Sequence, residues 1–189
     1  MRAACRRRQM VRSSVACRIR GLAQGELLFL IFLISAVVFV IFLGSLSYAE
    51  AKRTETAKAH AQLVVRVFEA LAAGESIPTP LQQACRLEEP RGGSTWSGCR
   101  AALIADGGSL SGLRNPFDDR QPLFSRQCDR ANPATRGAVV VEKGQAPITG
   151  APTVYSPIED SEPLVRGLML RIIACDKGSF STRVKELKL

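Results

Sequence analysis

The chain has 189 residues, enough for one globular domain besides a membrane segment, and carries a formal net charge of +9. Seven of its 26 basic residues are arginines at or before Arg20, where no acidic residue occurs. From Gly21 on, 19 basic residues stand against 17 acidic ones, without a shared pattern of aromatic and basic residues. This local origin of the charge excludes nucleic-acid binding as its explanation.

An uncharged run of 23 residues, 27–49, follows the basic segment. At about 1.5 Å of rise per residue, a helix of this run spans roughly 34 Å, enough to cross a hydrocarbon core of about 30 Å. Its apolar residues fall on every side of the helix, as contact with lipid requires. Basic residues beside a first span stay in the cytoplasm. We therefore predict a single-pass protein of the inner (cytoplasmic) membrane with its N-terminus inside and its C-terminal domain outside, in the periplasm or at the cell surface.

The residues after the run continue the helical pattern. Residues 50–73 are mostly good helix formers with a narrow apolar stripe at helical spacing. The stripe consists of Leu63, Val64, Val67, Phe68 and Leu71. Gly74 supplies a C-terminal stop, and Pro78 forbids continuation. These signals predict a basic leader over 1–21, one long helix over 22–73 and a separate domain over 74–189.

The cysteines agree with export of the C-terminal part. Cys5 and Cys17 precede the span, and an even set of four follows it. Four cysteines permit three connectivities, of which we predict the pairs Cys85 with Cys99 and Cys128 with Cys175. Metal binding is the rival interpretation, but the sequence has no CxxC and its only histidine lies on the helix. We expect neither a metal nor another cofactor.

The segment after Gly74 changes to short elements and turns. Thr79 as N-cap, Pro80 at N1 and Gln82 three residues on predict a helix of about ten residues that carries Cys85. Residues 91–98 are rich in glycine, serine and threonine and predict a loop. Trp96 within this loop is expected against the core rather than on an adhesive surface. The apolar run 99–105 is too short to classify.

Two turn segments follow, at 106–112 and 115–120. Asp118 and Asp119 could hold calcium, but no spaced set of oxygen ligands accompanies them, which favours a solvated turn beside Arg120. The glycines of the first segment lack the lysine-serine pair and the strand-loop-helix frame of a phosphate site.

The C-terminal part contains the clearest strands. Residues 138–142 and 168–175 are rich in β-branched residues and predict two strands. The proline-punctuated stretch between them predicts an extended loop with a short strand at 153–156. Residues 180–189 fit either a final strand or a closing helical turn. A small antiparallel sheet laid across the apolar stripe of the long helix gives an α+β fold.

No enzyme is predicted. His60 stands alone on a polar part of the helix and is expected to be solvated. The sequence has no nucleophile in a recognisable elbow, and its carboxylates lie in turns or on helix surfaces.

The junction between the basic leader and the span has a distinct order of residues. Gly21 ends the leader, Leu22 follows it, and Glu26 stands five residues after the glycine, where the apolar run begins. Over the first 73 residues this order resembles the class III signal of type IV prepilins and pseudopilins. Leucine at position 22 and a leader of 21 residues are closer to the type IVb branch.

The resemblance implies a type IV pilin-like or minor pilin subunit. It implies that a prepilin peptidase cuts after Gly21 and methylates Leu22 as the new N-terminus. It further implies that Glu26 pairs with the terminal ammonium of a neighbouring subunit while the helices bundle into a filament or pseudopilus. A lone carboxylate at the edge of lipid is costly, so this pairing recovers much of the cost and fixes the stagger between helices.

Two other interpretations stay open. The chain could remain an uncleaved membrane anchor with a binding or structural role in the periplasm, with Glu26 as a simple polar boundary. Alternatively, signal peptidase could cut after the Ser47-Tyr48-Ala49 sequence and release a soluble protein, although the apolar run exceeds the roughly 7–15 residues of a secretory signal.

Overall fold

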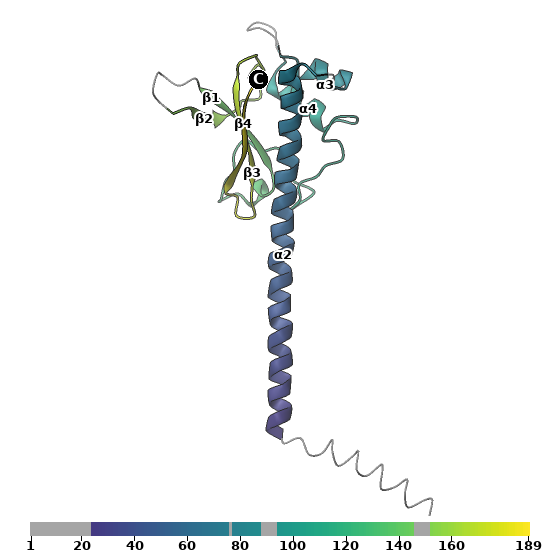
Figure 1. The fold of residues 1–189 in the computed structure, drawn as a ribbon, viewed down its shortest axis with the longest axis vertical. Coiled ribbons are helices and arrows are strands. Elements are labelled where there is room, and N and C mark those ends of the chain that lie inside the picture. The colour runs from purple at the N-terminus through teal and green to yellow at the C-terminus, as the bar shows by residue number, and fades with distance from the viewer. Residues whose placement is uncertain (1–23, 76, 88–93, 146–151) are drawn as a thin grey trace, which may run out of the picture. The chain divides into compact units, whose positions relative to one another are not determined.

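The computed structural model describes residues 24–75, 77–87, 94–145 and 152–189. Its longest element is helix α2, Gln24–Ala73, with 50 residues (Figure 1). The helix ends where the sequence predicts: Gly74 has a φ of +69°, a conformation that glycine adopts without steric cost, and its N–H donates to the carbonyl of Leu71. The expected first helical residue, Leu22, lies outside the described residues.

The chain divides into two compact units, at residues 1–48 and 49–189. The described part of the first unit is the helical stretch 24–48. The second unit contains the rest of α2 and all later elements, and it combines helices with one antiparallel sheet. The predicted α+β class is therefore confirmed.

Helix α3, Thr79–Ala84, is shorter than predicted and starts differently. Its N-cap is Pro78, and no side chain caps it, so the prediction of Thr79 as N-cap was wrong. The reason is that the carbonyl of Pro78 already accepts the N–H groups of Leu81 and Gln82, which moves the first turn one residue earlier. Cys85 forms the C-cap instead of continuing the helix.

Helix α4, Trp96–Ile104, begins inside the segment that the sequence analysis assigned to a loop. Thr95 is the N-cap, and its hydroxyl accepts the N–H of Gly98 at 3.4 Å. The expectation that Trp96 packs against the core is confirmed, because its side chain is only 3% exposed. Its ring lies 6.2 Å from that of Phe68 and edge-on to that of Phe124 at 5.6 Å.

The sheet has four strands in the order β2-β1-β3-β4, and each neighbouring pair is antiparallel. The strands are β1 Val139–Gln145, β2 Val154–Pro157, β3 Met169–Cys175 and β4 Ser181–Lys188. The last segment, for which strand and helical turn both stayed open, is thus a strand. Between β3 and β4, the Asp176 carboxylate accepts the N–H groups of Gly178 and Phe180 and holds the turn together.

One face of the sheet packs on α2 to form the main core. The buried strand residues of this face are Val139, Val141, Leu170, Ile172 and Ala174. The predicted helix stripe meets them: Val64, Val67 and Phe68 are buried, and Leu63 and Leu71 are partly buried against the same core. Complete burial of each large apolar side chain stabilises the fold by about 1.5–3 kcal/mol.

The opposite face of the sheet carries a second, smaller core. Ala138, the residue before β1, and Val140 of β1 lie with Ile173 and Cys175 of β3, and Cys128 packs against them. Successive strand residues point to opposite sides of the sheet, so β1 contributes side chains to the cores on both faces. The loop that contains Cys128 covers this face near the start of β1.

Candidate functional site

The apolar part of α2 is the most unusual surface of the described chain. Every large apolar side chain from Leu27 to Leu46 is at least 46% exposed. The helix is long and apolar enough to cross a membrane, and none of the residues in its most apolar window is buried inside the described chain. Isolated apolar side chains on a surface are ordinary, but a continuous patch of this size needs lipid or another protein to cover it.

Few polar groups interrupt this surface. Ser45 donates its hydroxyl to the carbonyl of Phe42 at 2.8 Å, and Ser35 donates in the same way to the carbonyl of Ile31. Both hydroxyls are therefore satisfied within the helix, as a low-dielectric surrounding demands. Glu26, in the first turn of α2, is the acidic residue at the start of the apolar run, and it is exposed.

The other two residues of the proposed processing signal, Gly21 and Leu22, lie outside the described residues. The structure places Glu26 in the first turn of the described helix. A carboxylate near a helix N-terminus interacts favourably with the helix dipole, which is one local reason for an acid at this position.

The four cysteines that follow the apolar run form two disulfides, in the pairing that the sequence analysis favoured. Cys85 bonds Cys99, with Cα atoms 4.5 Å apart, and ties α3 to α4. Cys128 bonds Cys175, with Cα atoms 5.5 Å apart, and ties the loop before β1 to the end of β3. Among the described residues, no group of three or more histidine, cysteine or acidic side chains could hold a metal ion.

His60 is not solvated, contrary to the prediction. Its side chain is 8% exposed, and its Nδ1 atom has no hydrogen-bond partner among the described residues. Burial lowers the pKa of His60 below the usual value of 6.5, because the charged imidazolium loses water. The prediction failed because the buried face of α2 begins before Leu63, the first residue of the predicted stripe. Ala57 and Ala61 carry it there and are fully buried.

Pairs of oppositely charged side chains lie on the face of the sheet that points away from α2, beside the second core. We call the exposed part of this face the solvent face of the sheet. Arg171 of β3 pairs with Glu142 of β1 at 2.5 Å and stacks over the Tyr155 ring at 4.2 Å. Arg183 of β4 pairs with Glu186 at 3.4 Å. Desolvation, followed by the charge and hydrogen bond of Glu186, raises the pKa of Tyr155 above its ordinary value of 10.0. Because each arginine has its own carboxylate, this face is a paired surface and not an anion site.

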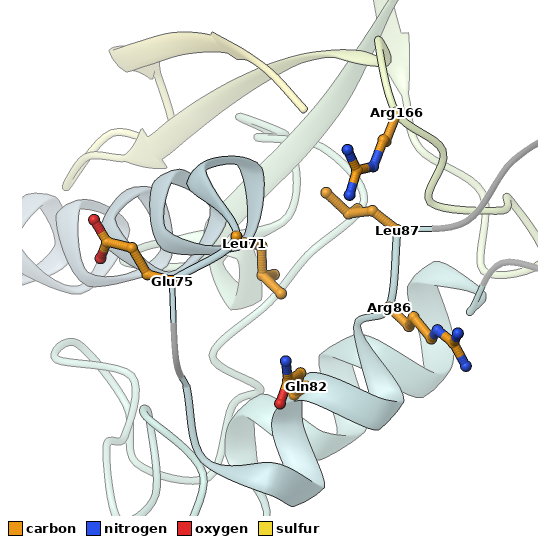
Figure 2. Close-up of a pocket in the computed structure, with 7 residues that line it drawn as sticks. Leu71, Glu75, Gln82, Arg86, Leu87 and Arg166 are labelled. Atoms are coloured by element: carbon orange, nitrogen blue, oxygen red, sulfur yellow. The ribbon is translucent and has the colours of Figure 1, made fainter.

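A shallow hollow of about 260 Å³ lies where α2 ends. It is lined by Leu71, Gly74, Glu75, Gln82, Arg86, Leu87 and Arg166. Figure 2 shows that these side chains come from the end of α2, from α3 with the residues after it, and from the segment before β3, and that Glu75 turns away from the others. Two of its lining residues border positions 76 and 88, which lie outside the described residues. We assign no chemistry to it.

The turn that the sequence predicts at 115–120 begins at a buried residue, Asn115, which is 3% exposed. Its Oδ1 accepts the N–H of Phe117, and its Nδ2 donates to the carbonyl of Arg136 at 2.8 Å. In the same turn Asp118 is exposed and accepts the N–H of Arg120. Asparagine before proline favours such a turn, since its side chain readily bonds the backbone two residues on. The bond to Arg136, which is distant in the sequence, was not predicted.

Comparison with known proteins assigns no family to the chain. No family model, no curated protein and no solved structure matches it. The chain's own residues therefore have to support any functional assignment.

Proposed function

We propose that the chain is a type IV pilin-like or minor pilin subunit that is exported and assembles through α2 into a filament or pseudopilus. The observation that supports this most is the contrast within one helix. Residues up to 48 expose apolar side chains on all sides, whereas from residue 57 on one face of the helix is packed in the core of an α+β domain. A helix of this kind can exchange a lipid surrounding for the apolar helices of other copies.

The basic leader sets the orientation in this proposal. Seven arginines before the span and no acid among them keep residues 1–20 in the cytoplasm, so that the domain is delivered to the periplasmic side of the inner membrane. The two disulfides suit that oxidising compartment. A prepilin peptidase then cuts between Gly21 and Leu22 and methylates the new terminus.

Glu26 has the role of fixing the register between copies. Transferring a carboxylate into lipid costs several kcal/mol, and breaking a buried ion pair by removing one partner costs about 3–5 kcal/mol. Pairing of the Glu26 carboxylate with the terminal ammonium of a neighbouring copy therefore favours one stagger of the helices. The exposed position of Glu26 in the first turn of α2 leaves the carboxylate accessible to such a partner.

The test is the mature N-terminus, measured by mass spectrometry on protein from membranes of cells that contain a prepilin peptidase. The proposal expects Leu22 as the first residue, with a methyl group on its nitrogen. Gly21→Val should leave the leader attached, whereas Gly44→Val, the same change inside the apolar run, should be processed normally. A native chain that keeps its leader would instead indicate an uncleaved anchor, and one that begins at Glu50 would indicate a secreted protein.

A further inference from the structure

The turn between β3 and β4 lies where the apolar run of α2 ends. Glu50 is the first charged residue after that run, and its carboxylate accepts a hydrogen bond from Lys177 of this turn at 3.0 Å. Both residues belong to the compact unit 49–189. If residues 27–49 occupy a bilayer, as the proposed function requires, then the contact with Glu50 brings Lys177 to the bilayer surface.

A second loop meets the turn at the same end of the sheet. The Cys128–Cys175 disulfide fastens it to the end of β3, and the N–H of Gly137 donates to the carbonyl of Cys175 at 3.0 Å. The hydroxyl of Thr135 also donates to that of Ser179 at 3.1 Å. Residues 126–136 therefore lie beside the turn, held by one covalent and two hydrogen-bonded links.

This end of the domain presents an exposed group of cations with one aromatic ring. We call Arg126, Arg130, Arg136, Lys177 and Phe180 the hairpin-end surface; all five side chains are exposed. The guanidinium of Arg130 lies 3.8 Å from the centre of the Phe180 ring, which is 46% exposed. Basic side chains beside an exposed apolar ring have the composition of protein surfaces that lie in the membrane interface.

Among the described residues, the acids of this end pair with one of its four cations, Lys177, and leave the three arginines without a carboxylate partner. Asp176 accepts backbone N–H groups of its own turn, and Asp129 accepts the N–H of Ala131. Glu50 is engaged by Lys177. Within the described residues, Arg126 and Arg136 form no ion pair, in contrast to the arginines on the solvent face of the sheet. The surface is thus available to an anionic partner.

We propose that the hairpin-end surface binds the anionic phospholipid headgroups of the membrane that holds α2. The covalent continuity of Glu50 with the apolar run favours this occupant, because it places the cations at the bilayer surface before any other molecule arrives. Lysine and arginine residues close to an anionic surface are attracted individually, and salt screens the attraction. The contact fixes which side of the domain faces the bilayer.

The experiment uses the full chain in lipid vesicles. Phe180→Trp places a fluorophore on the surface, and the native chain, whose only tryptophan is the buried Trp96, supplies the background. Quenching by lipids brominated on their acyl chains is compared between phosphatidylcholine vesicles and vesicles with phosphatidylglycerol added. We expect quenching of the new tryptophan to be at least about twofold greater with the anionic lipid and to fall with added salt.

Two charge variants in the Phe180→Trp background separate the surface from overall charge. Arg126→Gln with Arg136→Gln should remove the difference between the two lipids. Arg166→Gln with Lys188→Gln, two exposed cations near the end of the sheet where Gly167 bonds Leu189, should leave it unchanged. If both double variants behave alike, the effect belongs to net charge and the proposal is wrong.

Other outcomes would also overturn it. Equal quenching in both lipids would show that the headgroup charge is not recognised. If the fluorophore at position 180 instead becomes less quenched only as the amount of protein per neutral vesicle increases, a second copy of the chain covers the surface. A chain that does not float with vesicles would refute membrane anchoring and with it the proposed function, whereas a floating chain with an unquenched fluorophore would refute this inference alone.

Discussion

Loss of the Phe68 side chain is the sharpest test of how α2 is held in the domain. Phe68 is fully buried, and its ring lies 6.2 Å from Trp96, the only tryptophan of the chain. Truncation of a buried phenylalanine to alanine costs about 3–5 kcal/mol. With a denaturant slope of about 2 kcal/mol per molar urea, Phe68→Ala should lower the unfolding midpoint by about 1.5–2.5 M. Trp96 fluorescence of the full chain in detergent micelles follows the transition.

Phe180→Ala is the matched control, since it removes the same atoms from a side chain that is 46% exposed. This change exposes little buried surface and removes one stacking contact with Arg130, so we expect the free energy of unfolding to fall by at most about 1 kcal/mol. Equal midpoints for the two variants would refute the reasoning, because α2 would then not depend on the core around Phe68.

Two further predictions concern groups that the structure buries. Since burial lowers the pKa of His60 below 6.5, the folded state binds fewer protons than the unfolded state; stability should be complete above pH 6.5 and fall as the pH drops below it. Urea unfolding at about pH 7.5 and about pH 5.5 should show this loss in the native chain and not in His60→Leu, and an equal loss in both would remove His60 as its cause. Each disulfide stabilises the fold by restricting the unfolded chain. The 47-residue loop closed by Cys128–Cys175 corresponds to about 4 kcal/mol of stabilisation, and the 14-residue loop closed by Cys85–Cys99 to about 3 kcal/mol. Replacing each pair by alanine should therefore destabilise the domain in that order, and the reverse order in urea unfolding would contradict it.

The elements that the sequence predicts well are those with long apolar patterns. The end of α2 at Gly74 and the strands β1 and β3 follow from runs whose burial outweighs any local competition. The even set of four cysteines predicted disulfides but permitted three connectivities, of which the one that was favoured is confirmed. For β4, the alternating pattern left strand and helical turn open, and pairing with β3 selects the strand.

The failures lie where a tertiary contact overrides a local signal. Serine, threonine and glycine around Trp96 indicated a loop, but the burial of Trp96 and the cap from Thr95 start α4 there. Alanines at 57 and 61 gave no sign of a buried face, because small residues look neutral until a sheet covers them. His60 was consequently assigned to solvent. The hairpin-end surface escaped notice for a similar reason, since only the fold brings residues 126–136 beside the β3–β4 turn.

Assembly through Glu26 is tested most directly by copurification of two differently tagged copies from detergent-solubilised membranes. The native chain should be processed at Gly21, and one tag should recover the other copy. Glu26→Gln should still be processed but should lose this recovery, because no carboxylate then meets the terminal ammonium of the neighbour. Recovery of Glu26→Gln at the native level would contradict a filament whose register depends on this side chain.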